Sequence, residues 1–305
     1  VDLADPVSKY LPGFRNPVVC TADGKIEKAE REILLEDIMN MTSGLTYGGT
    51  DETGRQTDAL FQEVIHGLKE ENGGTISTVE LGKVPLLYQP GQSWSYGTSA
   101  DVVGAVIEVA SGMRFGDFLK KEIFEPLGMN DTDFWVPEEK QDRLAKVYDC
   151  REGQPSVRYL DNNLGIQNDM AYRPAYGAGL ASTIDDYAKF TQMLLNGGTY
   201  NGVQILRPAT VKFLGGHTLS AVQQAGFDNW IGLEGFSYGN LMRVLVDPTR
   251  AVTLGSKGEF GWDGWLGCYM EVVPEQNMTF LMMTQKKDAG TYTLSRKIRN
   301  IIFSE

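Results

Sequence analysis

Tyr96 stands out as a residue that could take part in catalysis, because of the sequence around it. A Pro-Gly turn precedes it, and the residues after it suit the N-terminus of a helix: Thr98, Ser99 and Asp101. The largely apolar run 102–110 predicts a buried helix that ends at Gly112. We therefore expect Tyr96 just before the first turn of a buried helix, with its phenol directed into a cleft.

Acyl transfer is the chemistry that such a tyrosine could support. The reaction needs a nucleophile, a base that deprotonates it, and hydrogen-bond donors for the developing oxyanion. A tyrosine can be that base only if its pKa, ordinarily about 10, is lowered. A neighbouring ammonium group lowers it, because the positive charge favours the phenolate.

Histidine-based hydrolysis does not fit this sequence. Residues 235–239 spell the Gly-x-Ser-x-Gly nucleophile elbow, with Ser237 at its centre. That motif requires a helix after the serine and a histidine further along, but both histidines, His66 and His217, precede Ser237, and strand-like sequence follows it. Two histidines also leave too few ligands for a typical zinc site. Ser237 is therefore not predicted as a nucleophile, and no metal or cofactor is expected.

Six segments of the chain resemble, in the same order, motifs of the serine β-lactamase and penicillin-binding-protein superfamily, in particular of class C β-lactamases and family VIII esterases. They are residues 5–12, 41–45, 96–98, 124–132, 177–187 and 261–267. The resemblance implies an α/β (α+β) fold in which an antiparallel sheet flanked by helices adjoins a mainly helical lobe. It also implies a serine hydrolase that works through an acyl-enzyme.

The tyrosine of the family's Tyr-x-Asn motif accepts the proton of the nucleophilic serine, and Tyr96 matches that tyrosine. Thr98 takes the place of the asparagine, which in the family helps to hold the amide side chain of β-lactam or peptide substrates. Because threonine is shorter and carries a single hydroxyl group, Thr98 as a substrate-binding residue favours the esterase branch over β-lactam turnover.

Trp262-Asp263-Gly264 stands where β-lactamases and DD-peptidases usually have Lys-Thr-Gly, and it resembles the Trp-x-Gly of family VIII esterases. The resemblance makes these three residues substrate-binding. Trp262 would form a flat apolar wall, Asp263 would repel anionic substrates, and Gly264 would let the strand approach the substrate closely. The backbone N–H of Trp265 would then donate to the oxyanion.

The family's nucleophile is the serine of a Ser-x-x-Lys motif. No serine of this sequence is followed three residues later by a lysine. We expect that motif upstream of Val1, on an N-terminal part of the catalytic lobe that is absent from this sequence or carried as a separate segment of the same protein. The alternatives are a D-amino-acid peptidase, DD-peptidase or β-lactamase of the same fold, and a binding module that has lost its nucleophile.

The composition is typical of a globular protein, and the family resemblance implies a small ester or amide as its substrate. The 305 residues can bury a large core, no apolar run approaches the length of a membrane span, and no targeting signal is visible, so we expect a cytoplasmic location. A net charge of −12 argues against nucleic acid as a partner. The three scattered cysteines predict neither a disulfide framework nor a zinc site.

Hydrophobic periodicity separates helices from strands along the chain. It predicts helices at 36–41, 102–110, 115–124, 184–195 and 291–302, strands at 241–246, 251–254, 268–273 and 278–284, and long loops at 46–57 and 147–179. The last helix should pack against the sheet through Leu294, Ile298, Ile301 and Ile302. We expect residues 1–20 and 175–305 to form the α/β lobe, and residues 21–174 to form the mainly helical lobe that carries Tyr96.

Overall fold

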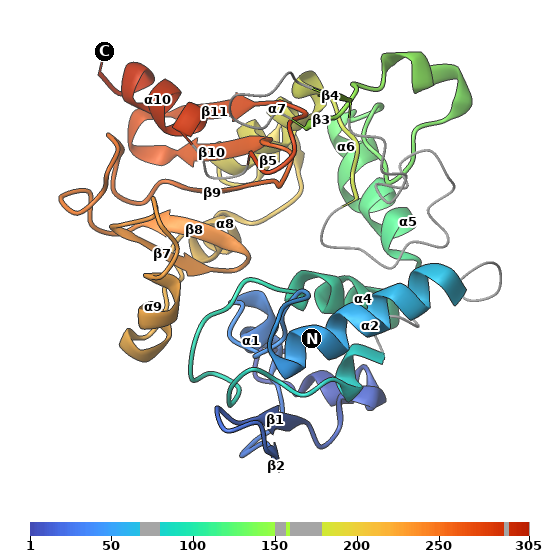
Figure 1. Ribbon diagram of the computed structural model, residues 1–305. Helices are drawn as coiled ribbons and strands as arrows, with labels where there is room; N and C mark the ends of the chain where they lie inside the picture. Colours follow the sequence, from blue (N-terminus) through green and yellow to red (C-terminus); the bar gives the residue numbers. More distant parts are fainter. Residues whose placement is uncertain (68–79, 150–156, 159–178, 290–292, 305) are drawn as a thin grey trace. The chain divides into compact units, whose positions relative to one another are not determined.

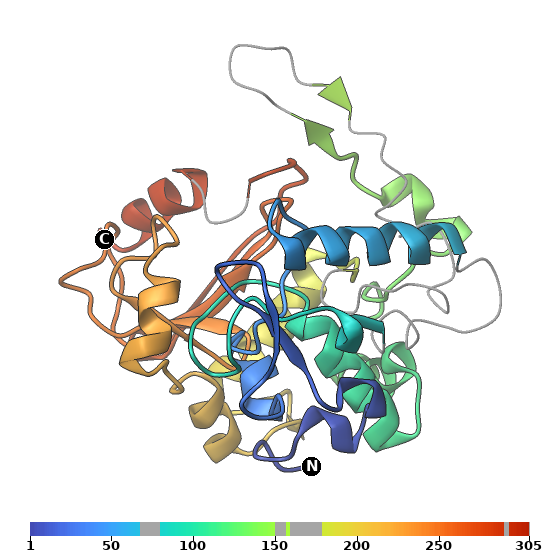
Figure 2. The same cartoon turned by 60° about the horizontal axis from the view of Figure 1, so that its bottom comes forward.

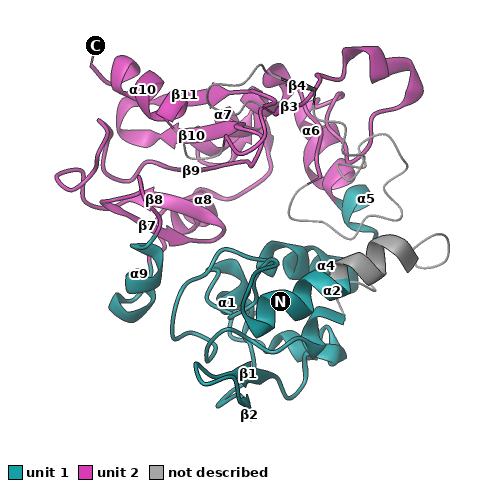
Figure 3. Ribbon diagram, viewed as in Figure 1, with its two compact units in different colours: residues 1–118, 169–178, 219–229 teal, residues 119–168, 179–218, 230–305 magenta. Residues whose placement is uncertain are grey.

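The chain folds into two compact units (Figure 3). The computed structural model describes residues 1–67, 80–149, 157–158, 179–289 and 293–304. Unit 1 comprises residues 1–118, 169–178 and 219–229, and unit 2 comprises residues 119–168, 179–218 and 230–305.

Unit 1 combines helices with a small two-stranded sheet. Its elements are the 3-10 helices η1 (Val7–Lys9), η2 (Pro12–Phe14) and η3 (Leu81–Lys83), the antiparallel strands β1 (Val18–Cys20) and β2 (Ile26–Lys28), and the helices α1 (Leu35–Met39), α2 (Glu52–Gly67), α4 (Ser99–Ser111) and α9 (Ala221–Phe227). The 16-residue helix α2, drawn in blue in Figure 2, is the longest of these. Helix α5 (Phe115–Leu119) lies where the chain passes from unit 1 to unit 2.

Helices α1 and α4 pack together in the core of unit 1. Helix α4 contains the helix predicted at 102–110. It ends at Gly112, whose left-handed conformation (φ 68°) glycine adopts without strain. Val7, Leu11 and Phe14 of the N-terminal segment are buried in this same core. Residues 1–20 therefore group with the Tyr96 segment, which differs from the expected division of the chain.

Unit 2 is built on a five-stranded antiparallel sheet with the order β11-β10-β9-β8-β7 (Figure 1). Its strands are β7 (Phe236–Gly239), β8 (Met242–Leu245), β9 (Phe260–Asp263), β10 (Tyr269–Val273) and β11 (Met278–Met282). The hairpin between β10 and β11 turns through the 3-10 helix η8 (Pro274–Gln276) and ends at Asn277 with a φ of 50°. Proline at position 274 and asparagine at position 277 are typical turn residues.

Helices and two short pairs of strands complete unit 2. They are the π-helix η4 (Lys120–Phe124), α6 (Glu125–Leu127), the 3-10 helix η5 (Glu138–Arg143), α7 (Ile184–Leu195), α8 (Pro208–Leu214) and α10 (Thr293–Ile302), and the pairs β3 (Tyr148–Asp149) with β4 (Val157–Arg158) and β5 (Thr199–Tyr200) with β6 (Val203–Gln204). Helix α7 packs on β10 and β11. Its buried Met193 and Leu194 belong to a core that includes Val244 and Phe260 of the sheet.

Three of the four predicted strands are present as β8, β10 and β11, but residues 251–254 do not form a strand. The N–H of Leu254 donates to Asn300 Oδ1 (2.8 Å), and its carbonyl accepts from Arg299 Nη2 (2.8 Å). Because side chains of α10 satisfy these backbone groups, this part of the chain is held without a neighbouring strand.

Helix α10 presents a different face to the sheet from the one predicted. Leu294 and Ile301, expected in the core, are 55% and 64% exposed, whereas Arg299 is buried. Two carboxylates, Glu259 and Glu271, form ion pairs with Arg299. The prediction is wrong for these two apolar residues. It assumed that the apolar face of the helix is buried, whereas the buried residues of α10 are the polar Ser295 and Arg299.

Helix α2 begins at Glu52, inside the predicted loop 46–57. A Cβ atom on Gly54 would lie 2.5 Å from the backbone nitrogen of Gly49, so the glycine at position 54 allows a close approach of the helix to the preceding chain. The predicted loop 147–179 lies almost entirely outside the described residues. Within the described part of the chain, none of the helices has the length and apolar character that a membrane span requires.

Candidate active site

Tyr96 lies three residues before α4, as predicted, and its side chain is half-buried. Its ring is 5.7 Å from that of Tyr47 and 6.4 Å from that of Trp94, measured between centroids. Trp94 is buried and makes an edge contact with Phe227 of α9 at 4.9 Å. Helix α9 therefore supports the aromatic segment that carries Tyr96.

The loop 41–45 docks directly on the Tyr96 segment. The N–H of Ser95 donates to the carbonyl of Met41 (3.0 Å), and the hydroxyls of Ser43 and Ser99 are 2.9 Å apart and buried. A Cβ atom on Gly97 would lie 2.4 Å from the carbonyl oxygen of Leu45. Two of the six family-like segments are thus parts of one structure, and only glycine fits at position 97.

Thr98 is the N-cap residue of α4, but its hydroxyl does not cap the helix. The side chain is completely buried, and Oγ1 donates to the carbonyl of Thr46 over 3.5 Å. This hydroxyl ties the Tyr96 segment to the chain that follows Leu45. The substrate-binding role of Thr98 remains a prediction.

Tyr47 sets the electrostatic surroundings on one side of Tyr96. Burial raises the pKa of the Tyr47 phenol well above its ordinary value, and the charges of Asp101 and Tyr96 raise it further. Tyr47 therefore stays protonated at neutral pH. Because the Asp101 carboxylate lies in the same region, a positive charge would be needed to favour a phenolate at Tyr96.

In unit 2, β9 carries the Trp262-Asp263-Gly264 motif. The ring of Trp262 contacts Tyr238 (5.0 Å) and Trp230 (5.8 Å) edge-on, which makes a group of three aromatic rings. A Cβ atom on Gly261, just before the motif, would lie 2.0 Å from the carbonyl oxygen of Met270. The sheet therefore holds this strand tightly, and the aromatic wall expected of Trp262 is anchored by its neighbours.

Gly264 and Trp265 lie in the turn that joins β9 to β10. The N–H of Gly264 donates to the carbonyl oxygen of Cys268 (2.7 Å), and the N–H of Gly267 donates to the carbonyl oxygen of Gly264 (2.9 Å). Trp265 therefore occupies the second position of a β-turn. Its side chain is 46% exposed, and its Nε1 donates to Asp288 Oδ1 (2.6 Å). The proposed use of the Trp265 backbone N–H as an oxyanion donor remains a prediction.

Asp263 faces a partner that the sequence does not reveal. Its Oδ1 accepts a hydrogen bond from Arg243 Nη1 at 2.7 Å, and the two side chains are 4% and 2% exposed. The carboxylate charge is thereby neutralised inside the unit. Because this charge is paired, the surroundings of Asp263 do not favour the expected repulsion of anionic substrates. A direct contact between Asp263 and the substrate remains a prediction.

A buried ionic network extends from this pair toward α10. Arg299 binds Glu259, Glu271 and the Tyr269 hydroxyl, with Nη1 3.1 Å from that hydroxyl and Nη2 2.6 Å from Glu259 Oε1. Burial, followed by the nearby Glu271 carboxylate, raises the pKa of Glu259 to about 8. Sequence reasoning missed this network. The signal that could have found it is Glu271, an acidic residue in an otherwise apolar strand.

Ser237 lies within β7, paired with Val244 of β8, and is 2% exposed. A strand follows it instead of a helix, so the Gly-x-Ser-x-Gly stretch is confirmed not to be a nucleophile elbow. Cys20 and Cys268 are free thiols. Among the residues whose positions are described, no cluster of histidine, cysteine and acidic side chains suits a metal ion.

An antiparallel sheet flanked by helices, with a family-like tyrosine segment and a Trp-x-Gly strand, defines the class of serine β-lactamase-like proteins. The family model described as "Beta-lactamase" matches residues 1–301, and the chain belongs to this family. The solved structure of simvastatin synthase (LovD) from Aspergillus terreus has a TM-score of 0.80 at 20% identity, covering 99% of this chain and 76% of that one.

Three curated relatives are more similar in sequence. An uncharacterised protein of Mycobacterium tuberculosis is 29% identical over 93% of this chain and 71% of its own length. Esterase EstB of Burkholderia gladioli is 28% identical with the same coverage of each chain. A protein of Escherichia coli, whose name gives D-alanyl-D-alanine carboxypeptidase as a suggested activity, is 27% identical over 92% of this chain and 62% of its own length.

Proposed function

We propose that this protein is a serine hydrolase that cleaves small esters or amides through an acyl-enzyme, or passes the acyl group to an acceptor. In this proposal Tyr96 is the general base, the backbone N–H of Trp265 donates to the oxyanion, and Trp262 forms an apolar wall for the substrate. The observation that carries the proposal is the Trp262 motif itself, held by Tyr238 and Trp230 on a strand without the lysine of β-lactamases.

The residues of the third motif favour an ester over a β-lactam. A lysine ammonium attracts the carboxylate that penicillins carry, and here an indole takes its place. The neighbouring carboxylate of Asp263 is paired with Arg243, so neither residue offers a charge for that recognition. A neutral acyl group is the substrate that an aromatic wall fits. The similarity to esterase EstB supports this choice.

The nucleophile of this proposal is not among the described residues. No serine in the printed sequence has a lysine three positions later, and acylation needs both groups close to the base. We therefore place the Ser-x-x-Lys motif in sequence that precedes Val1. Its lysine would also supply the positive charge that a phenolate at Tyr96 needs.

A D-alanyl-D-alanine peptidase is the second candidate, and the E. coli relative favours it. Such an enzyme must recognise the terminal carboxylate of a peptide. Arg243 is turned to Asp263, so any cation for this purpose must come from elsewhere. Hydrolysis of a D-alanyl-D-alanine dipeptide with little activity on esters would select this candidate.

The experiment compares hydrolysis of p-nitrophenyl acetate and butyrate with that of benzylpenicillin and a D-alanyl-D-alanine peptide. It uses two polypeptides, the 305-residue chain and the chain extended by its native upstream sequence. We expect the extended protein to have a far larger kcat/KM for the esters. Intact-mass measurement with a fluorophosphonate should show one adduct on the extended protein and none on the 305-residue chain.

Three results would contradict this proposal. The first is a kcat/KM for benzylpenicillin equal to or above that for the esters. The second is an extended protein with no activity and no adduct, which would make the protein a binding module. A stoichiometric adduct on a serine of the 305-residue chain would show that the nucleophile lies among the residues printed here.

A further inference from the structure

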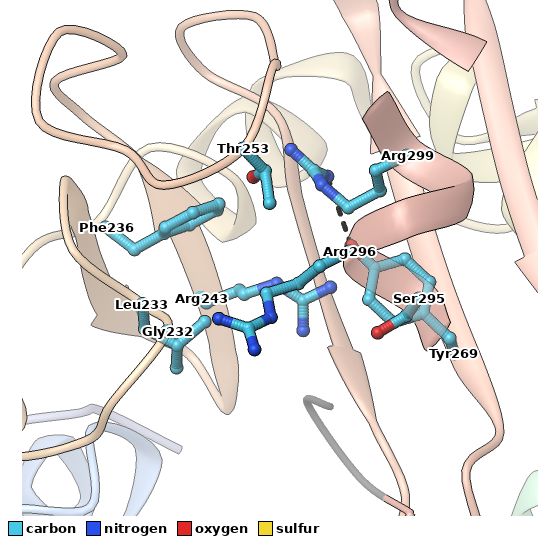
Figure 4. Close-up of a pocket in the computed structure, with 9 residues that line it drawn as sticks. All are labelled: Gly232, Leu233, Phe236, Arg243, Thr253, Tyr269, Ser295, Arg296 and Arg299. Carbon is cyan, nitrogen blue, oxygen red and sulfur yellow. Dashed lines mark hydrogen bonds between the residues drawn. The ribbon is translucent and has the colours of Figure 1, made fainter. Parts of the chain in front are cut away.

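A small cavity in unit 2 is lined by three arginine side chains (Figure 4). Arg243 comes from β8, and Arg296 and Arg299 come from α10. The remaining lining residues are Gly232, Leu233, Phe236, Thr253, Tyr269 and Ser295. The cavity volume is about 10 Å³, enough for one water-sized species and too small for an organic ligand.

Two of the three guanidinium groups bring buried donors without partners to this cavity. Arg243 is 2% exposed, and while its Nη1 binds Asp263, its Nη2 has no hydrogen-bond partner among the residues that the structure describes. The Nε of Arg296 is likewise buried, and no group in the described part of the chain pairs with it. An unsatisfied buried donor on a charged group is costly, and arginine cannot remove the cost by losing its proton.

The aromatic neighbours do not satisfy these donors. The Arg243 guanidinium carbon lies 4.5 Å from the centre of the Tyr269 ring and 6.0 Å from that of Phe236. Ring faces favour the charge of a guanidinium, but its in-plane N–H groups still need acceptors. Since none of the described residues supplies an acceptor for Nη2, a species inside the cavity is the candidate acceptor.

The charge balance around the cavity favours an anion. In the part of the chain that the structure describes, the ion pairs of this cluster involve Arg243 and Arg299 but not Arg296. The charge of Arg296 is thus not matched by a carboxylate in these ion pairs, and an anion in the cavity would neutralise it.

We propose that this cavity binds a single monatomic anion, chloride under ordinary conditions, between the Arg243 and Arg296 guanidinium groups. The anion accepts hydrogen bonds from Arg243 Nη2 and Arg296 Nε and neutralises the charge of Arg296. Its binding would join α10 to β8, and through the Arg243–Asp263 pair it would stabilise the Trp262-Asp263-Gly264 strand. The inference concerns binding and does not depend on the proposed hydrolase activity.

Thermal unfolding of the purified protein tests the proposal. Circular dichroism would follow the Tm while sodium chloride replaces sodium gluconate at constant ionic strength, so that screening of surface charges does not change. Gluconate is too large for the cavity. An anion that binds only the folded state stabilises it, so we expect a saturable rise in Tm of about 2–4 °C, and bromide should act like chloride.

Two variants of α10 provide the controls. Arg296→Met removes one of the two donors and should abolish the dependence of Tm on chloride. Lys297→Met removes the same charge from the next, exposed position of the helix and should retain that dependence. A cavity that holds only water would give coincident chloride and gluconate titrations, and this result would overturn the proposal. So would an Arg296→Met variant that keeps the full dependence.

Crystals of the unsubstituted protein grown in sodium bromide give a direct readout that does not require any variant to fold. Anomalous diffraction should locate one bromide within hydrogen-bond distance of Arg243 Nη2 and Arg296 Nε. A map with no anomalous peak in the cavity would refute the site. Peaks only at exposed lysines and arginines would also refute it.

Discussion

Arg243 Nη1 lies 2.7 Å from Asp263 Oδ1, and the two side chains are 2% and 4% exposed. The pair joins the centre of β8 to the end of β9, beside the residues proposed to contact the substrate. Removing one partner of a buried ion pair leaves a charge without compensation, whereas removing both can cost little. The stability of β9 and of the motif on it should therefore depend on the two residues together.

A double-mutant cycle on this pair tests that dependence. We expect Arg243→Met and Asp263→Asn each to lower the free energy of unfolding by about 3–5 kcal/mol, because each leaves a buried charge unpaired. The double variant should lose much less than the sum of the single losses. Urea unfolding measures all three, and additive losses would show that the residues do not act as a pair. Lys25→Met, in the exposed pair with Asp23, should cause no measurable change.

Tyr96→Phe tests the proposed base and uses the extended, active protein. The substitution keeps the ring contacts with Tyr47 and Trp94 and removes only the hydroxyl, so the fold should barely change. We expect kcat for p-nitrophenyl esters to fall about 10²–10⁴-fold, with KM little altered. Tyr88→Phe, in the same unit with its hydroxyl on Met41, should keep nearly full activity. If Tyr96→Phe retains more than about half of kcat, Tyr96 is not the base.

Gly97→Ala tests whether close packing places Tyr96. The new Cβ atom would lie 2.4 Å from the Leu45 carbonyl oxygen and 2.6 Å from Thr46 Cα, so the backbone must move. We expect a loss of about 1–3 kcal/mol in the free energy of unfolding and a clear fall in kcat. Gly49→Ala, where the nearest atom would be a side-chain oxygen at 3.4 Å, is the matched control. Equal stabilities for the two variants would contradict the packing argument.

Glu259→Gln tests the buried carboxyl group. Since burial raises the pKa of Glu259 in the folded protein to about 8, from an ordinary value near 4.5, the folded state holds a proton that the unfolded state has lost. Its contribution to stability is complete below about pH 4.5 and is lost as the pH rises to about 8. Glutamine resembles the protonated carboxyl group and does not titrate, so the variant should not lose this stability as the pH rises.

The measurement is the free energy of unfolding of both proteins at several pH values. Between pH 5 and 8 we expect the free energy of unfolding of the Glu259→Gln variant to rise relative to that of the unsubstituted protein, by up to about 1.4 kcal/mol per pH unit. Glu275→Gln, at an exposed position of η8, should leave the pH profile unchanged. Parallel profiles for Glu259→Gln and the unsubstituted protein would show that Glu259 is ionised when folded.

Local sequence patterns predicted the elements whose core face is apolar. Helix α7 has the predicted bounds, because its apolar residues recur at helical spacing and Thr183 caps it by accepting from the N–H of Asp186. The position of Tyr96 before α4 follows from the same kind of signal. The turn at Asn277 was equally predictable, since proline and asparagine mark it directly.

The predictions failed where the partner of a residue lies far along the chain. Residues 251–254 have the composition of a strand, yet α10 binds the backbone of Leu254 through Asn300 and Arg299. No local pattern reports such a partner, because a side chain more than 40 residues away supplies it. Helix α10 illustrates the same point, since Glu271 of β10 and Glu259, just before β9, pair with Arg299 on its buried face.

The sequence by itself determined the family of this protein and the residue types of its candidate site, because motifs such as Trp262-Asp263-Gly264 are short and contiguous. Tertiary structure alone decided the environment of those residues. It placed Asp263 against Arg243, committed the Thr98 hydroxyl to Thr46, and brought Arg243 and Arg296 to one cavity. The physical reason is that charge and hydrogen-bond energies depend on distance and burial, which arise only when segments far apart in the chain are folded together.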